Sequence, residues 1–136
     1  MEIDPWASKG IQNYKEICEK FGLDTVDHTK LPSPTHLHRR GIIFAHRDLN
    51  NILDARKAGR PFGVLSGLMP SGQIHLGHKM VIDQAKWFQD LGGDVTITVA
   101  DLEAHATRGL SLKKCRKYAI EEYISNYAGM GLNPDK

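Results

Sequence analysis

The chain has 136 residues, a length that fits one domain, or one domain with part of a second. Hydrophobic residues make up 40% and charged residues 25%, as in ordinary soluble globular proteins, and a net charge of +2 is too small to indicate nucleic-acid binding by itself. The two distant cysteines argue against a disulfide scaffold or a structural metal, and no apolar window could span a membrane, so we expect a cytoplasmic protein.

The N-terminal part predicts helices joined by irregular segments. A helix is expected to begin at a Ser8 cap and to end at Gly22. Residues 24–38 turn polar and contain two prolines, which predicts a linker or a loose loop. Asp48 is expected to cap a second helix that ends near Gly59.

The C-terminal part alternates strand and helix. Residues 62–66 and 94–100 are strand candidates, and the second of them is almost entirely β-branched. A helix is expected over residues 75–91, with its apolar face made of Met80, Val81, Trp87, Phe88 and Leu91. A last helix, from Ser111, carries an apolar residue at every fourth position: Cys115, Ala119, Tyr123 and Tyr127.

This alternation predicts an α/β fold with a Rossmann-type parallel sheet. We therefore divide the chain into a mainly helical appendage, residues 1–60, and a core, residues 61–136, that forms the first half of such a sheet. Ligands of parallel sheets gather at the carboxyl ends of the strands, so the segments that follow the two strands are expected to share one crevice.

The stretch from Ser66 to His78 carries the strongest functional signal. It places a turn, Pro70-Ser71-Gly72, between the first core strand and a helix whose first turn holds His75 and His78. A helix start offers unpaired N–H groups and partial positive charge, and imidazoles add donors, so the stretch suits a phosphate. A plain turn with a surface pair of histidines is the alternative, but the order strand, glycine turn, histidines and helix favours a nucleotide pocket.

Several polar side chains are candidates for catalysis or substrate binding. His75 and His78 are expected to donate hydrogen bonds where charge develops on a phosphate, which is electrostatic catalysis. Asp101 and Glu103 are expected to accept from a substrate's ammonium group or ring N–H, with a helix N-cap as the alternative. Thr98 points into or away from the crevice depending on strand parity. No nucleophilic triad and no Walker-type lysine motif is present.

The turn and its histidines resemble a known signature. Pro70-Ser71-Gly72 followed by His75-Leu76-Gly77-His78 resembles the first signature of class I aminoacyl-tRNA synthetases, in the form used by the tryptophanyl and tyrosyl branch. Flanking stretches are similar to the archaeal and eukaryotic tryptophanyl-tRNA synthetases: Arg39-Arg40-Gly41, His46-Arg47-Asp48-Leu49-Asn50, Lys79-Met80, Trp87-Phe88-Gln89 and Ala100-Asp101-Leu102-Glu103-Ala104. The resemblance extends over nearly the whole chain, from Pro5-Trp6 onward.

The resemblance implies a reaction and a set of roles. ATP and tryptophan would bind in the Rossmann pocket with Mg²⁺ accompanying ATP, tryptophanyl-adenylate and pyrophosphate would form, and the amino acid would pass to tRNA(Trp). His75 and His78 would stabilise the triphosphate in the transition state, Gly77 would lie under the adenine, and residues 70–72 would line the nucleotide. Glu103 resembles the acid that contacts tryptophan. A homodimer is expected for the complete enzyme.

Two positions depart from the family. Leu65 stands where the best-known members of the branch have a tyrosine, and Thr98 where eukaryotic relatives have a glutamine; both family residues help to hold the amino-acid ring. We expect Leu65 and Thr98 to lie beside the substrate without reproducing those contacts. Leu65 also lacks a hydroxyl to meet a phenol, which weakens the tyrosyl alternative.

A larger departure is length. The second class I signature, a lysine-rich loop, does not occur, and the chain ends at Lys136. We therefore expect the N-terminal portion of a tryptophan–tRNA ligase, with a tyrosyl-tRNA synthetase or a catalytically incomplete nucleotide-binding fragment as the alternatives. Small nucleotidylyltransferases share a His-x-Gly-His turn but lack a long N-terminal appendage, so residues 6–60 argue against them.

Overall fold

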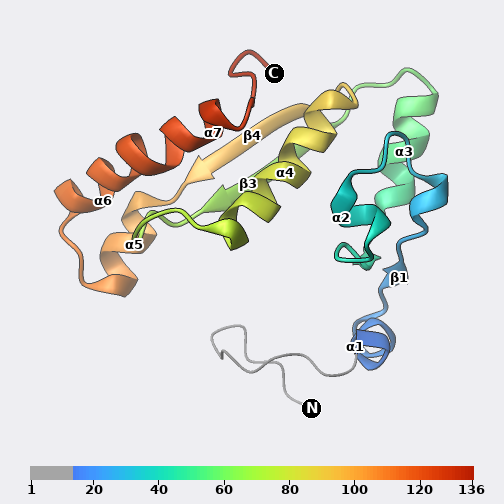
Figure 1. The fold of residues 1–136 in the computed structure, drawn as a ribbon, viewed down its shortest axis with the longest axis horizontal. Helices are drawn as coiled ribbons and strands as arrows, with labels where there is room; N and C mark the ends of the chain where they lie inside the picture. The colour runs from blue at the N-terminus through green and yellow to red at the C-terminus, as the bar shows by residue number, and fades with distance from the viewer. Residues whose placement is uncertain (1–13) are drawn as a thin grey trace. The chain divides into compact units, whose positions relative to one another are not determined.

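The computed structural model describes residues 14–136 (Figure 1). The chain forms two compact units, the first ending at Leu49 and the second running Asn50–Lys136. The boundary that the sequence suggests, between residues 60 and 61, stays a prediction. Within the described part of the chain, no helix combines the length and the apolar character that crossing a membrane requires.

The first unit consists of short elements. They are α1 Tyr14–Phe21, β1 Asp24–Thr25, a 3-10 helix His28–Lys30, α2 His36–Arg39 and β2 Ala45–His46, which pairs antiparallel with β1. Gly22, at φ +58°, follows α1 and ends it as predicted, because a left-handed residue cannot continue the helix. The predicted cap Ser8 lies outside the described residues.

Residues 24–38 are folded, so the loose linker that their composition predicts is wrong. Asp27 caps the 3-10 helix, since its carboxylate accepts from the Thr29 amide at 3.1 Å and from the Thr29 hydroxyl at 2.6 Å. These hydrogen bonds hold the pKa of Asp27 at about 2. In α2, Nδ1 of the buried His38 accepts from the amide of Thr35 at 3.1 Å. The polar side chains thus satisfy the backbone donors of short helices.

Helix α3, Leu49–Lys57, comes directly before the first strand of the core in the chain. Gly59, at φ +66°, follows it as predicted. At its start, the Leu49 amide donates to Nδ1 of His46 at 3.4 Å, and Asp48 has φ +60°. An N-cap residue normally has an extended backbone, so the cap predicted for Asp48 is wrong and His46 supplies the acceptor.

The second unit contains the predicted strand–helix alternation. Strands β3 Gly63–Leu68 and β4 Asp94–Val99 are parallel, joined by α4 Leu76–Asp90, and their register runs from Gly63↔Asp94 to Leu68↔Val99. The chain continues through α5 Asp101–Arg108, α6 Leu112–Tyr118, a π-helical segment Ala119–Ile124 and α7 Ser125–Gly129. The β-α-β order with a parallel pair confirms the Rossmann-type α/β fold.

The core of this unit lies against one face of the two strands. Ile82 of α4 meets Tyr123 and Tyr127, which come from the C-terminal helical run. Around these three pack Leu68, Ile74, Ile97, Val99, Met130 and Leu132. Figure 1 shows α4 and the α6–α7 run flanking the two strands. Apolar side chains from β3, β4, α4 and the C-terminal helical run are thereby buried in one core.

The inward face of α4 differs from the prediction. Trp87 and Leu91 are buried as predicted, but Met80 and Val81 are 36% and 40% exposed. The inward positions belong to Ile82, Ala85 and Gln89, at spacings of three and four. That spacing is the period of one helix face, whereas the predicted set mixed residues from two faces.

The C-terminal helical run keeps one face buried over four turns. Cys115, Ala119, Tyr123 and Tyr127 are all buried, which confirms the predicted face. At 3.6 residues per turn, each four-residue step rotates about 40° beyond a full turn, so three steps drift by about 120°. The wider turn of the π-helical segment Ala119–Ile124 takes up this excess and keeps the four side chains aligned.

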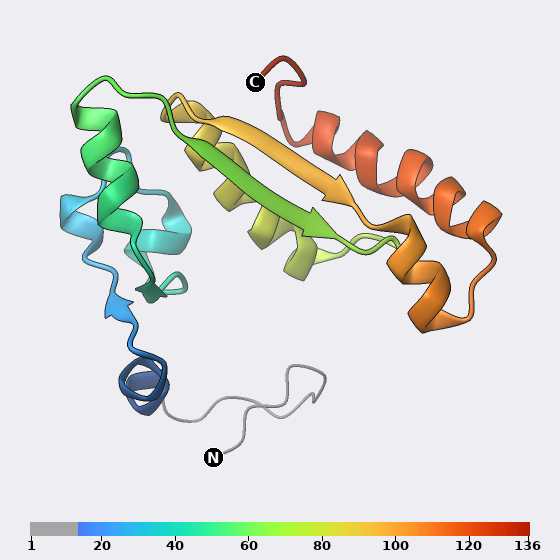
Figure 2. The ribbon, with the colours of Figure 1, turned by 180° about the vertical axis from the view of Figure 1, so that it is seen from behind.

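The other face of the strands is open. Leu65 is 75% exposed, and Gly67 and its register partner Thr98 are exposed too. Figure 2 views the strands from behind, with α4 on their far side. Because side chains alternate along a strand and register partners share a face, Leu65 and Thr98 lie on the same side of the sheet.

Candidate functional site

The segments that follow β3 and β4 emerge at the same edge of the sheet. Leu68 and Val99 end the two parallel strands as register partners, and the Ala100 amide donates to the carbonyl of Leu68 at 3.0 Å. Beyond them, the Thr107 hydroxyl reaches Sδ of Met69 at 3.3 Å. The two segments therefore lie at one edge of the sheet as predicted, and the crevice expected between them stays a prediction.

The loop from β3 to α4 is anchored at one residue and exposed at the next. Pro70 is fully buried, whereas Ser71 is exposed and Gly72 is half-buried. The Ser71 amide donates to the Met69 carbonyl at 2.8 Å, which closes a tight turn. A buried proline fixes the path of the backbone, and the glycine carries no side chain that would shield it.

His75 and His78 cap α4 reciprocally. Nδ1 of His75 accepts from the Gly77 amide at 3.2 Å, and the His75 amide donates to Nδ1 of His78 at 3.1 Å. Histidines occupy here the positions of the Ser/Thr and Glu/Gln of an ordinary capping box. The expectation that the helix offers unpaired amides to an anion is therefore wrong for Gly77, whose amide is taken by an imidazole.

The capping bonds also fix where the ring protons lie. A backbone amide can only donate, so each Nδ1 is an acceptor, and in each neutral ring the proton is on Nε2. The ring centroids of His75 and His78 are 3.9 Å apart, and the planes are tilted by 39°. The two neighbouring rings at the start of α4 therefore each carry a donor on Nε2, opposite the Nδ1 that accepts from a backbone amide.

The surroundings keep the second ring uncharged. Burial lowers the pKa of His78 below its ordinary value of 6.5, and the neighbouring His75 lowers it further. Tyr123 packs edge-on against the His78 ring, with 5.6 Å between centroids and 66° between planes. Lys79, the next cation along α4, is held by both carboxylate oxygens of Asp83 at 2.6 Å. Local electrostatics therefore favour a neutral imidazole at His78.

The two candidate carboxylates differ in their partners. Asp101 begins α5, and its Oδ2 accepts from Nε of Arg116 at 3.0 Å. Glu103 is exposed in the first turn of α5, and its carboxylate has no partner among the contacts of the described residues. Of the two, Glu103 remains available to a ligand. The pairing partner Arg116 gave no sequence signal, because its contact lies 15 residues away from Asp101.

Sequence reasoning missed the part that Tyr123 plays beside the histidines. The four-residue spacing places it on a buried helix face, but nothing in the sequence indicates that this face meets His78. The contact depends on how α6–α7 packs against α4, which is a tertiary property.

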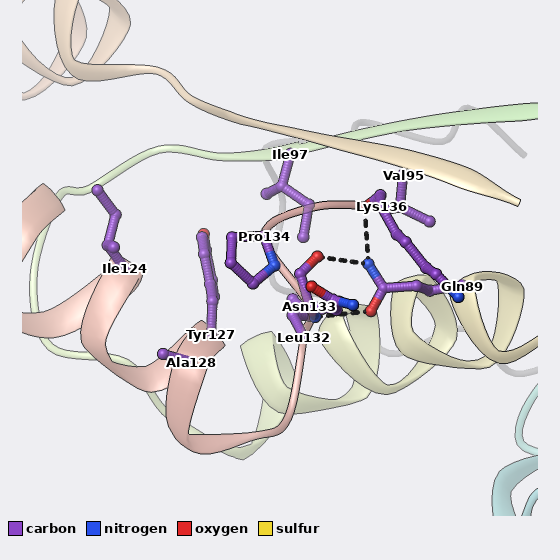
Figure 3. Close-up of a pocket in the computed structure, with 10 residues that line it drawn as sticks. All are labelled: Gln89, Val95, Ile97, Ile124, Tyr127, Ala128, Leu132, Asn133, Pro134 and Lys136. Carbon is purple, nitrogen blue, oxygen red and sulfur yellow. Dashed lines mark hydrogen bonds between the residues drawn. The ribbon is translucent and has the colours of Figure 1, made fainter.

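A cavity of about 250 Å³ lies away from the histidines, near the opposite end of α4 (Figure 3). Its walls include Val95, Ile97 and Tyr127. At its rim, the buried Gln89 donates from Nε2 to the carbonyls of Asn133 at 2.9 Å and Lys136 at 2.7 Å, and its Oε1 accepts from the Asn133 amide at 2.8 Å. This side chain ties the C-terminal segment to α4.

Comparison with known proteins gives a consistent result. Residues 57–136 match the family described as class I tRNA synthetases for W and Y. The tryptophan–tRNA ligase of Methanosarcina acetivorans is 43% identical over 98% of this chain and 31% of its own length. That of Thermoplasma acidophilum is 46% identical over 97% of this chain and 30% of its own length.

Solved structures agree with the sequence comparison. The tryptophanyl-tRNA synthetase of Aeropyrum pernix matches with a TM-score of 0.81 at 40% identity, over 97% of this chain and 38% of that one. The tryptophanyl-tRNA synthetase of Encephalitozoon cuniculi bound to tryptophan matches with a TM-score of 0.77 at 29% identity, over 92% and 37%. The chain thus spans about a third of the length of the relatives it matches.

Proposed function

Because this chain belongs to the class I tRNA synthetases of the tryptophan and tyrosine branch, we propose that it is the N-terminal portion of a tryptophan–tRNA ligase. The proposed reaction is ATP-dependent activation of tryptophan followed by its transfer to tRNA(Trp). The observation that carries it is the pair of Nε2–H donors of His75 and His78 at the start of α4, beside the carboxyl ends of two parallel strands.

We propose the following roles for the nucleotide site. The Nε2–H groups of His75 and His78 donate to phosphate oxygens as charge builds up in the transition state, while each Nδ1 keeps its capping bond. The backbone of residues 70–72 receives the nucleotide, together with Leu76 and Gly77, which are both exposed at the helix start. Mg²⁺ would accompany ATP and would help to neutralise its phosphates.

We assign the amino-acid side of the site to four residues. Leu65 and Thr98 share the open face of the sheet, and the carboxylate of Glu103, beyond the end of β4, has no partner within residues 14–136. Asp101 acts through its pair with Arg116, which orders the start of α5. The relatives named tryptophan–tRNA ligase, and a leucine where a phenol substrate would need a hydroxyl partner, support tryptophan over tyrosine.

The remaining partners are also proposals. tRNA(Trp) and a second copy of the enzyme are expected to bind the complete protein, and the cytoplasm is the proposed location because tRNA is charged where proteins are made. For the isolated chain, a second candidate is nucleotide binding without turnover. It is favoured by the fact that the chain spans only 31% of the Methanosarcina relative.

Calorimetric titration of the 136-residue chain with ATP and then tryptophan, together with pyrophosphate exchange over several amino acids, tests this proposal. Exchange with tryptophan alone supports the ligase, and exchange with tyrosine replaces it by the sister enzyme. ATP binding without any exchange supports the second candidate. A chain that binds neither ATP nor tryptophan would contradict the assignment of the site.

A further inference from the structure

Tyr123 combines complete burial with an unpaired hydroxyl. Its side chain is 0% exposed, and its hydroxyl oxygen has no hydrogen-bond partner of normal geometry among the described residues. Burying an unpaired hydroxyl is unfavourable, and phenylalanine would fill the same apolar space without that cost. Since the same holds for Tyr127, burial of the hydroxyl does not by itself assign a role, and the contacts of Tyr123 have to be considered.

The contacts of Tyr123 lead to the nucleotide loop. Its ring packs edge-on against His78, with 5.6 Å between the ring centroids, and it shares the core with Leu68 and Ile74, which flank the loop between β3 and α4. The backbone amide of Ser71 acts on the phenol oxygen and lowers its pKa, against the larger rise caused by burial. That amide donates its hydrogen bond to the Met69 carbonyl, so the phenol oxygen lies near the amide without being its hydrogen-bond partner.

The π-helical segment Ala119–Ile124 explains how the side chain reaches this place. Tyr123 lies within it, and the wider turn keeps its ring on the face that meets α4. The hydroxyl of Ser125 donates to the carbonyl of Ile120 at 2.9 Å, which satisfies one acceptor in the irregular turn. Single π turns inside α-helices are frequent at functional sites.

Tyr127 provides an internal comparison. It is also buried, its hydroxyl also lacks a partner among the described residues, and it follows Tyr123 by four residues on the same helix face. Its ring, however, lines the cavity that Gln89 also lines (Figure 3), whereas the ring of Tyr123 packs against His78. The two tyrosines thus share burial and chemistry and differ in what they face.

We propose that Tyr123 is a positioning residue of the nucleotide site, holding the His78 ring and the backbone of residues 70–72 in the arrangement that receives the triphosphate. The proposal takes its ligand, ATP, from the proposed function. The packing of Tyr123 against His78 and the residues that flank the loop is observed independently of that function. Tyr123 acts through these groups and does not itself touch the phosphates, since its side chain is completely buried.

The test compares Tyr123→Phe and Tyr123→Leu with Tyr127→Phe and Tyr127→Leu in the 136-residue chain. Two quantities are measured in each: the dissociation constant for ATP by calorimetry, and the pKa of His78 by NMR titration of its ring protons. Circular dichroism confirms that a variant is folded, and the two phenylalanine variants keep the core filled if the leucine variants unfold.

We expect Tyr123→Leu to weaken ATP binding at least tenfold, because the backbone of residues 70–72 loses the ring packed between Leu68 and Ile74. The same variant should bring the pKa of His78 back toward 6.5, because the ring packed against His78 is lost. Tyr123→Phe keeps the ring, so it should retain the lowered pKa and lose about threefold in ATP affinity through the missing oxygen near the Ser71 amide. Both Tyr127 variants should match the parent in both quantities.

Equal ATP affinities for the Tyr123 and Tyr127 variants would overturn the proposal, and so would an unchanged pKa of His78 in Tyr123→Leu. If the parent chain fails to bind ATP, the proposed function fails. The titration of His78 then still decides whether Tyr123 positions this ring.

Discussion

Gly77 leaves the space that the His75 ring occupies: a Cβ atom at position 77 would lie 3.1 Å from both Nδ1 and Cε1 of His75. Such a distance is tighter than an ordinary van der Waals contact, and it involves the nitrogen that caps α4. The glycine therefore has a role within the chain itself, namely to let an imidazole lie over the first helical turn. The proposed place of the adenine above it is a separate requirement.

Gly77→Ala should weaken nucleotide binding while leaving the stability of the fold almost unchanged. Alanine favours the helix by about 1 kcal/mol over glycine, and losing the cap costs about 1 kcal/mol, so the free energy of unfolding should change little. Displacement of the His75 ring should weaken ATP binding severalfold in a calorimetric titration. Gly129→Ala, a helical position with open space around the added methyl group, is the control and should leave ATP binding unchanged.

His75→Ala and His78→Ala should lower the pyrophosphate exchange rate by about 10²–10³-fold each, as for the removal of one donor to a developing charge. ATP affinity should change much less, because the donors act mainly in the transition state. Equal losses in rate and affinity would count against this role.

His38→Ala is the matched control for the histidine variants. His38 makes the same capping bond, from the Thr35 amide to Nδ1 at 3.1 Å, at the start of α2. Because His38 is buried as well as capping, the variant should lower the free energy of unfolding by about 2–4 kcal/mol and leave the exchange rate per folded molecule at the parental value. A large fall in exchange would mean that cap removal alone disturbs catalysis.

The lowered pKa of His78 predicts a pH dependence of stability. Since the pKa in the folded state lies below the 6.5 of the unfolded chain, the unfolded state binds the proton first, and stability falls as the pH drops through about 6.5. Urea unfolding of the parent and of His78→Gln should therefore differ more at pH 7.5 than at pH 5.5. A difference that grows on acidification would contradict the lowered pKa.

Gly67→Ala should destabilise the sheet. The added Cβ would lie 3.1 Å from the carbonyl oxygen of Thr98 and 3.3 Å from its Cβ, in a backbone fixed by the ladder. We expect a loss of about 1–3 kcal/mol in the free energy of unfolding, measured by denaturant titration. Gly63→Ala in the same strand, 3.9 Å from the Asp94 carbonyl, is the control and should cost little.

Gln89→Leu should release the C-terminal segment. The amide of Asn133 and the carbonyls of Asn133 and Lys136 lose their buried partner, which we expect to cost about 1–3 kcal/mol and to speed digestion by carboxypeptidase. Gln84→Leu is the control on the same helix. Its Nε2 is buried without a partner among the described residues, so its removal should be neutral or stabilising.

Local signals in the sequence were enough for the core elements. The β-branched run that became β4, the turn before α4 and the Ser111 cap, which accepts from the Lys114 amide at 3.3 Å, all depend on neighbours within a few residues. The parallel order follows from strand–helix alternation. These features needed no knowledge of distant contacts.

The features that escaped prediction depend on tertiary packing or on unusual capping chemistry. The inward face of α4 is decided by where Tyr123 and Tyr127 meet Ile82. Asp48 was expected to cap α3, whereas an imidazole, His46, provides the acceptor. The only sign of the π turn in the sequence is that buried residues recur every four positions, whereas an α-helix has 3.6 residues per turn.

The reciprocal histidine cap gives the same two side chains a role in folding stability and in the proposed catalysis. Aspartate or serine at position 75 would cap a helix at least as well as an imidazole does, since both belong to the favoured cap residues. Directed evolution for heat resistance alone would therefore tend to exchange His75 for one of them, and the Nε2–H group would disappear with it. A library built on this scaffold should hold positions 75 and 78 constant and seek its gains elsewhere.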